Sequence, residues 1–243
     1  MLWALAGGVV VVVAAVAAVV AVKIWIARAE ARRRQAVAGL ADRLGLEYSP
    51  VEVNCIVPRF MSFRALDRGD ERQAVNVIFG QFQGREAYAF DYNYKIVRYE
   101  KGRRHELNFY LSAAVVCLDC QLPGLLIRPR NLLDRLAAAV GHQDIEFESH
   151  EFSSKFHVQA ADRKFAYDVV NAQTMQYLLG CGGWSLELSG SAAIIYTGKR
   201  WKVPDFALGL EVLTGFVEHI PHFVWKQLGS AQELARQERE GQR

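Results

Sequence analysis

The chain has 243 residues, of which 51% are apolar and 23% charged, and this balance excludes an intrinsically disordered or low-complexity protein. Four cysteines in a chain of this length exclude a disulfide scaffold. The net charge of +3 gathers at the N-terminus, since residues 1–34 hold five basic residues and one acidic residue. The nearly neutral remainder excludes a general polyanion binder, and no nucleic-acid partner is expected.

The N-terminal segment predicts a membrane anchor. Residues 2–22 form an uncharged run of 21 residues, which as a helix spans about 31 Å, close to the hydrocarbon thickness of a bilayer. Trp3 and Trp25 lie near its two ends, where indole rings favour the membrane–water interface. A cleaved signal peptide is the alternative, but no lysine or arginine precedes the run. We therefore expect a transmembrane helix within residues 1–28, with the lipid bilayer as the partner of residues 2–22.

The basic residues after this run predict an orientation. Lys23, Arg28 and the run Arg32-Arg33-Arg34 all follow the apolar segment. The positive-inside rule then predicts a single-pass protein of the inner membrane, with its N-terminus outside and its C-terminal domain in the cytoplasm. The arginine run is interpreted as a topology signal, with recognition of anionic lipid as the alternative.

Residues 29–45 predict a juxtamembrane helix that continues the anchor. Val37, Leu40, Ala41 and Leu44 fall on one face at helical spacing, and Gly45 suits the helix end. This stripe is expected to dock on the domain that follows. That domain is predicted over residues 46–230, with a subdivision near 142–155 left open, and residues 231–243 are expected to form a flexible tail.

Strand and helix signals alternate along residues 46–230. The runs Val75–Phe82 and Arg85–Tyr94, separated by Gln83-Gly84, predict a hairpin. Further expected elements are a strand over 107–118, a turn at Pro123-Gly124, a short strand over 125–127, a helix over 131–140, a helix after Asp162, and a second hairpin over 184–197 turning at Gly190. A helix opened by Pro204 is expected to bury Phe206, Leu210, Leu213 and Val217 and to break at Pro221. The predicted fold class is α+β, with one N-terminal transmembrane helix followed by a soluble domain of antiparallel hairpins packed with helices on one face.

A weak candidate polar site lies in the first hairpin, at Asp91, Tyr92 and Tyr94. Asp91 falls on the strand face opposite the aromatic residues. It could act as a general base or ligand contact, although binding to the backbone of a neighbouring loop is favoured. The tyrosine row could stack bases or sugars, although a core face is the favoured interpretation.

No metal site or cofactor is expected. Cys117 and Cys120 end an apolar strand, where residues three apart point to opposite faces, so they are interpreted as structural thiols. His219 and His222 could share a helix face, but Pro221 between them disrupts the helix that would fix that geometry. Trp201 could touch the membrane interface or a partner, and a turn-packed aromatic is the favoured interpretation.

Two groups of residues carry a family resemblance. The first comprises Leu40-Ala41-x-x-Leu44-Gly45, Asn76-Val77-Ile78-Phe79-Gly80, Gly84 and Phe90-Asp91-Tyr92-Asn93-Tyr94, and the second Phe156-x-Val158, Asp162, Leu178-Leu179 and the segment 184–197. Over most of residues 36–225 the chain resembles uncharacterised bacterial single-pass membrane proteins, related to domain-of-unknown-function families. The resemblance implies an inner-membrane setting and no catalytic residues.

Three hypotheses about function remain. The first is a membrane-tethered interaction or scaffold module with an unknown protein partner, because the sequence holds no complete catalytic set. The second is a membrane-proximal enzyme with Asp91 as acid or base. The third is a small-ligand or lipid sensor using an apolar cleft beside the aromatic hairpin. A deep pocket where Asp91 meets a histidine would favour the enzyme, and a flat exposed apolar patch would favour the scaffold.

Overall fold

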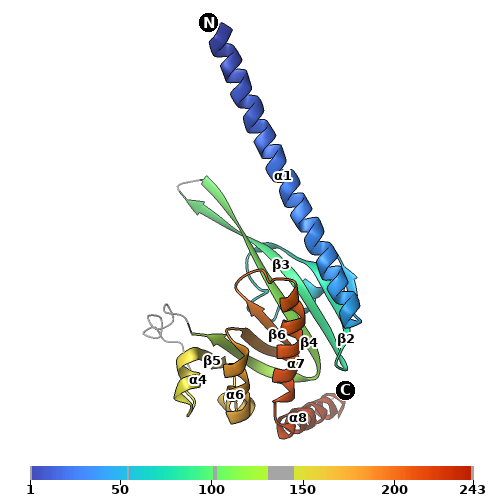
Figure 1. Ribbon diagram of the computed structural model, residues 1–243. Coiled ribbons are helices and arrows are strands. Elements are labelled where there is room, and N and C mark those ends of the chain that lie inside the picture. Colours follow the sequence, from blue (N-terminus) through green and yellow to red (C-terminus); the bar gives the residue numbers. More distant parts are fainter. Residues whose placement is uncertain (1, 54, 101–102, 131–144, 242–243) are drawn as a thin grey trace.

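The computed structural model describes residues 2–53, 55–100, 103–130 and 145–241 of the chain. Its helices are α1 (Leu2–Leu44), α2 (Ile56–Arg59), α4 (His150–Lys155), α5 (Arg163–Val169), α6 (Ala172–Cys181), α7 (Pro204–Glu218) and α8 (His222–Gly241). Its strands are β1 (Glu47–Ser49), β2 (Asp70–Phe82), β3 (Arg85–Glu100), β4 (Arg103–Pro129), β5 (Phe156–Ala160) and β6 (Ser185–Thr197). The fold is α+β, with helices packed on an antiparallel sheet (Figure 1).

The sheet is built around the long strand β4. The strands follow the order β1-β2-β3-β4-β5, and β6 pairs with β4 as well. Residues 112–116 of β4 lie between β3 and β6, and toward the end of β4 strand β5 takes the place of β3. All pairings are antiparallel. Because β4 pairs with β3, β5 and β6, it links the β2–β3 hairpin to the rest of the sheet.

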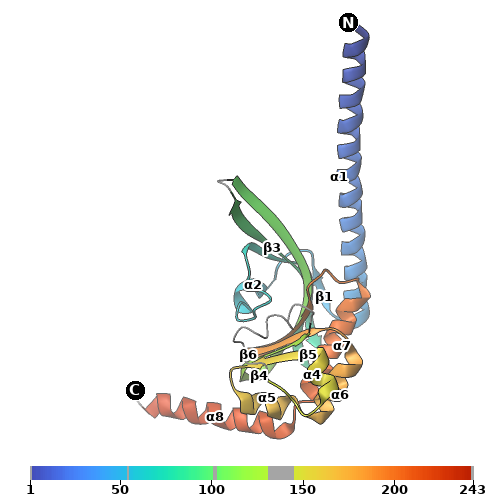
Figure 2. The same ribbon diagram turned by 90° about the vertical axis from the view of Figure 1, so that its left-hand side faces the viewer.

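Both faces of the sheet are covered, whereas the sequence predicted helices on one face. One core lies between the sheet and helices α1 and α4–α8, and it includes Ile78, Ala89 and Ile195. The other lies on the opposite face under α2 and the segment after it, with Phe63 and Phe90 at its centre. Figure 2 shows α2 on one side of the sheet and α1 and α7 on the other. We call these the α7-side core and the α2-side core.

Helix α1 has two parts with different surroundings. Its C-terminal part packs on the sheet, where Val37, Leu40 and Ala41 are buried, as the helical spacing predicted. Its N-terminal part extends away from the domain (Figures 1 and 2). In that part the side chains from 15 to 29 are exposed, including those of Val19 and Trp25. Among the side chains of α1 that the structure describes, those that pack on the domain therefore lie in its C-terminal part.

The prediction of a transmembrane helix is corrected by the structure. Within the described ranges, no helix is both long and apolar enough to cross a membrane. The side chains of α1 are described from Ala15 onward, and in that part the apolar run ends at Lys23 and charged residues follow as far as Arg43. The orientation inferred from the flanking charges presupposed a membrane span, and nothing in the fold supports it.

The second predicted hairpin is also wrong. Residues 185–197 form one continuous strand, β6, that pairs with β4 on both sides of Gly190. The register shifts at this point, and Gly190 has a φ of 58°, so it marks a bulge rather than a hairpin turn. Likewise, Pro123-Gly124 stays within β4 instead of forming a turn. Glycine and proline favour both turns and bulges, so the sequence pattern is the same for the two. Only pairing with the neighbouring strand distinguishes a bulge from a turn.

Other predictions are confirmed. The hairpin of β2 and β3 turns at Gln83-Gly84, and Asp162 accepts hydrogen bonds as the N-cap of α5. The apolar stripe of α7 is buried in the α7-side core, with Phe206, Leu210 and Leu213 all at 0% exposure. Helix α7 ends before Pro221, and α8 begins after it. The helix predicted over 131–140 lies outside the described residues.

Candidate functional site

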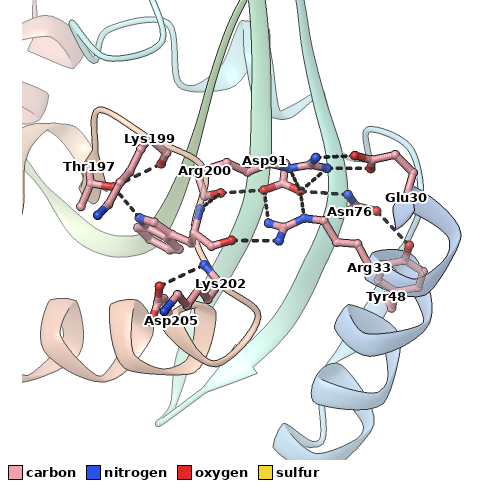
Figure 3. A network of polar contacts seen from close by, with 12 residues as sticks. Glu30, Arg33, Tyr48, Asn76, Asp91, Thr197, Lys199, Arg200, Lys202 and Asp205 are labelled. Atoms are coloured by element: carbon pink, nitrogen blue, oxygen red, sulfur yellow. Dashed lines mark hydrogen bonds and ion pairs between the residues drawn. The ribbon is translucent and has the colours of Figure 1, made fainter. Parts of the chain in front are cut away.

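Asp91 is the centre of a buried polar network between α1, the sheet and the loop before α7 (Figure 3). It lies on β3 and points to the α7-side core, because its neighbours Phe90 and Tyr92 face the α2-side core. Its side chain is completely buried. A charged carboxylate in this position needs strong partners, since removing it from water is costly.

Two arginines provide these partners. Arg33 of α1 donates to both carboxylate oxygens, from Nε to Oδ2 at 2.8 Å and from Nη2 to Oδ1 at 2.7 Å. Arg200, in the loop before α7, donates from Nε to Oδ2 at 3.1 Å. The paired geometry of Arg33 is the strong, directional form of a guanidinium–carboxylate contact.

Two neutral side chains of the sheet complete the shell around Asp91. Ser112 of β4 donates from Oγ to Oδ1 at 2.6 Å, and Asn76 of β2 donates from Nδ2 to Oδ2 at 2.9 Å. Asn76 has a φ of 52°, within an irregularity of β2 between Val75 and Ile78. Asparagine tolerates this left-handed conformation better than most residues, and such bulges redirect side chains.

The network extends from Asp91 to the loop and back to the helix. Arg200 also donates to Glu30 of α1, with N–O distances of 2.5 and 2.8 Å. The backbone of Trp201 donates to Ser112 Oγ at 2.9 Å and accepts from Arg33 Nη1 at 2.8 Å. We call Glu30, Arg33, Asn76, Asp91, Ser112 and Arg200 the Asp91 network. Its two carboxylates and two guanidinium groups balance in charge.

The network keeps Asp91 ionised. Burial by itself raises the pKa of Asp91, but hydrogen bonds from Arg33, Ser112 and Asn76 outweigh it, so the pKa lies below its ordinary value. The hydrogen bond from Arg200 likewise lowers the pKa of Glu30. A carboxylate with a lowered pKa and five donors is a poor general base, because a proton on it would displace those donors. The arrangement is suited to holding α1 against the domain.

The three residues of the predicted polar site do not converge. Tyr92 and Tyr94 belong to the α2-side core, on the other face of the sheet from Asp91. The hydroxyl of Tyr92 donates to the backbone oxygen of Leu66 at 2.6 Å, and burial raises its pKa to about 12. Tyr94 stacks on Phe109 with ring centroids 5.1 Å apart. The row of tyrosines on β3 is therefore a core face, which is the interpretation favoured by the alternation of residues along the strand.

Sequence reasoning missed the arginines that hold Asp91, although a signal was present. Glu30 and Arg33 precede Val37 and Leu40 at spacings of three and four, so they share the face of α1 that docks on the domain. Arg33 was grouped with Arg32 and Arg34 as a topology signal, but those two neighbours are exposed. Nothing in the sequence singled out Ser112 or Arg200.

Cys117, Cys120, His219 and Trp201 have structural surroundings, whereas His222 is exposed. Cys117 packs beside the α2-side core, where burial raises its pKa to about 12, and Cys120 packs beside the other core. His219 stacks on Tyr177, with centroids 4.4 Å apart. Trp201 is buried in the α7-side core, edge to face with Trp184 and Phe206. Among the described residues, no group of three or more metal-ligating side chains is assembled.

A second buried carboxylate lies at Glu187 of β6, on the α2-side face. Its donors are both neutral: the backbone N–H of Arg64 at 2.8 Å and the hydroxyl of Tyr196 at 3.3 Å. Burial raises the pKa of Glu187, and the hydrogen bond and charge of Arg64 only partly offset it. Glu187 also lines a cavity of about 210 Å³ with Ser62, Arg64 and Gln159.

Comparison with known proteins gives one informative likeness. No protein-family model matches the chain, and no curated protein matches its sequence, so the resemblance to bacterial membrane proteins stays a prediction. The crystal structure of the mycobacterial trehalose monomycolate transport factor A has a similar fold, with a TM-score of 0.51 and 11% sequence identity. The match covers 78% of this chain and 95% of that one. At this identity the likeness establishes a shared fold and nothing about activity.

Proposed function

We propose that this protein is a membrane-associated interaction module. In this proposal the N-terminal part of α1 binds a lipid surface, and the Asp91 network holds the α+β domain at a fixed orientation to that helix. The observation that carries the proposal is the exposure of large apolar side chains on the part of α1 that leaves the domain.

The exposed apolar surface of α1 is extensive. Its members are Val16, Val19, Val20, Val22, Ile24, Trp25 and Ile26, each between 47% and 71% exposed. Contiguous apolar surface of this kind is characteristic of protein or membrane interaction sites. The basic residues Lys23 and Arg28 lie within or just after it, and both suit anionic lipid headgroups.

The fold neighbour supports a lipid-related setting. That neighbour is a mycobacterial transport factor for trehalose monomycolate, a lipid. The carboxylate of Asp91 already accepts five hydrogen bonds. It therefore favours a rigid interaction module over a membrane-proximal enzyme that uses Asp91.

The lipid contact can be tested by flotation of the full chain with phosphatidylcholine vesicles. The double change Val19→Asp and Val20→Asp places two charges on the exposed surface, and moving charges out of water is strongly unfavourable. We expect the variant to lose flotation by a factor of ten or more. Val51→Asp is the matched control, because Val51 is 62% exposed in a loop of the domain. Flotation of the double variant at the wild-type level would contradict the proposal.

The fixed orientation can be tested separately by hydrogen exchange. Arg33→Met removes the helix's contact with Asp91, so the amides of α1 around Arg33 should exchange faster. Arg32→Met is the matched control, because Arg32 is exposed on the same turn of the helix. Equal exchange in both variants would show that the network does not hold α1.

A further inference from the structure

The β3–β4 hairpin extends beyond the rest of the sheet. Pairing of β2 with β3 ends at Asp70↔Lys95, and pairing of β6 with β4 ends at Ser112↔Thr197. Within the described sheet, residues 96–100 of β3 pair only with residues 103–107 of β4, and residues 108–111 of β4 pair only with β3. We call residues 96–100 and 103–111 the β3–β4 arm. Both views show the arm projecting on the same side of the domain as the free part of α1 (Figures 1 and 2).

The arm presents apolar and aromatic side chains to solvent. Tyr99 is 73% exposed, Tyr110 54% and Leu107 44%. A two-stranded ribbon has little stability of its own in water, and it buries none of these groups. An exposed ribbon of this composition therefore points to a surface that it contacts.

Arginines outnumber glutamates in the described residues near the tip of the arm, with Arg98, Arg103 and Arg104 against Glu100 and Glu106. Arg98 and Arg103 are exposed, and neither has an acidic partner in the described part of the structure, whereas Arg104 pairs with Glu106 at 2.9 Å. Tyr99 follows Arg98 in β3 and is paired with Arg104 of β4. Tyrosine and arginine together are typical of the membrane–water interface, where the ring meets the lipid boundary and the guanidinium meets phosphate.

We propose that the tip of the β3–β4 arm is a second lipid contact, in which Arg98, Tyr99 and Arg103 bind anionic headgroups. This inference rests on the proposed function, since it uses the same lipid surface that α1 binds. The helix supplies the apolar contact, and the arm adds further contacts with anionic headgroups to those of Lys23 and Arg28. Two separated contacts on a rigid domain fix its orientation to the surface, which α1 alone would leave free to rotate about the helix axis.

Vesicle composition separates the two contacts. The full chain is floated with vesicles of phosphatidylcholine alone and of phosphatidylcholine mixed equally with phosphatidylglycerol. For the double variant Arg98→Gln and Arg103→Gln, binding to the anionic vesicles should weaken by about fivefold for each arginine, or roughly 25-fold for the pair. Binding to phosphatidylcholine alone should be unchanged.

A charge-matched control is available at the other end of the molecule. Arg163 and Lys226 are exposed, and they belong to α5 and α8, helices that lie away from the arm (Figure 2). Their replacement by glutamine removes the same net charge, so it should weaken anionic binding much less than the arm variant does. Equal losses in the two double variants would overturn the inference, because they would report only total charge. If the wild-type chain floated with neither vesicle type, the proposed function itself would be overturned.

Photocrosslinking identifies what the tip touches. With p-benzoylphenylalanine in place of Tyr99, irradiation on anionic vesicles should give a lipid adduct of the full chain. The same group in place of Tyr167 of α5, which is 46% exposed at the opposite end, should give none. No adduct at position 99 would contradict the lipid contact. A crosslink from position 99 to a second protein chain would also contradict it and would favour strand pairing with a protein along the arm's edges.

Discussion

Two carboxylates are buried on opposite faces of the same sheet, and their surroundings differ in one decisive respect. Asp91 meets two guanidinium groups, whereas Glu187 meets a backbone amide and a phenol. Burial raises the pKa of both, yet the pKa of Asp91 lies below its ordinary value and that of Glu187 above it. The difference shows that burial alone does not determine the charge of a carboxyl group; its donors do.

The two sites also differ in what they connect. The Asp91 network joins α1, β2, β3, β4 and the loop before α7, which are far apart in the sequence. Glu187 joins the segment after α2 to β6 and borders a cavity. The first site therefore stabilises the arrangement of the whole molecule, and the second is a local contact. The predictions below test this contrast.

The largest effect is expected from Asp91→Ala. Removing the carboxylate leaves Arg33 and Arg200 buried or half-buried without their shared partner, which typically costs about 3–5 kcal/mol in the free energy of unfolding. Urea unfolding of the full chain measures it, with the exposed Asp119→Ala as the control. Since the folded-state pKa of Asp91 is lowered, its stabilisation is present above the unfolded pKa of about 3.9 and is lost as pH falls below it. If Asp91→Ala lowered the free energy of unfolding only as much as Asp119→Ala does, the contrast between the Asp91 and Glu187 sites would disappear.

Ser112→Ala should have the next largest effect. The hydroxyl donates to Asp91 and accepts from the buried backbone N–H of Trp201, so its removal leaves that N–H without an acceptor. An unsatisfied buried group of this kind costs about 1–3 kcal/mol in the free energy of unfolding. Ser191→Ala on the exposed side of β6 is the control. If both serine variants unfold at the same urea concentration, Ser112 does not support the network.

Glu187→Gln should instead raise the free energy of unfolding at pH 7. The folded-state pKa of Glu187 is raised, so its contribution to stability is full below the unfolded pKa and is lost as pH rises through the folded value. Glutamine stays neutral, and the variant should therefore be as stable as wild type at acidic pH and more stable at pH 7, by about 1 kcal/mol or less. Unfolding at both pH values measures it, with the exposed Glu211→Gln as the control. A loss of stability at pH 7 would mean that the ionised form is the one favoured by folding.

The smallest effect is expected from Glu30→Gln. Glu30 is the outermost member of the Asp91 network, with 40% of its side chain exposed, and Arg200 keeps its contact with Asp91 without it. Ion pairs at such positions contribute about 1 kcal/mol or less. Thermal unfolding in low and high salt should show a small difference that salt reduces. A cost approaching that of Asp91→Ala would indicate that Glu30 and Asp91 act as one unit.

Local patterns were sufficient for elements whose signal lies within a few neighbouring residues. The β2–β3 hairpin, the cap of α5 and the buried stripe of α7 all followed from turn residues, a capping side chain and helical spacing. The bulge at Gly190 did not, because a glycine in an extended segment turns or bulges according to the strand beside it. The apolar N-terminal run suggested a transmembrane helix, but within the described residues no helix meets that requirement.

For the candidate site, the sequence by itself determined that Asp91 occupies the strand face opposite the tyrosines, because side chains alternate with a period of two. It did not determine the partners of Asp91. Arg33 and Arg200 lie 58 and 109 residues away in the chain, and no local pattern links them to Asp91. Only the tertiary structure decided which carboxyl would meet guanidinium groups, because packing α1 and the loop before α7 on one face of the sheet brought both arginines to Asp91 and left Glu187, on the other face, with neutral donors.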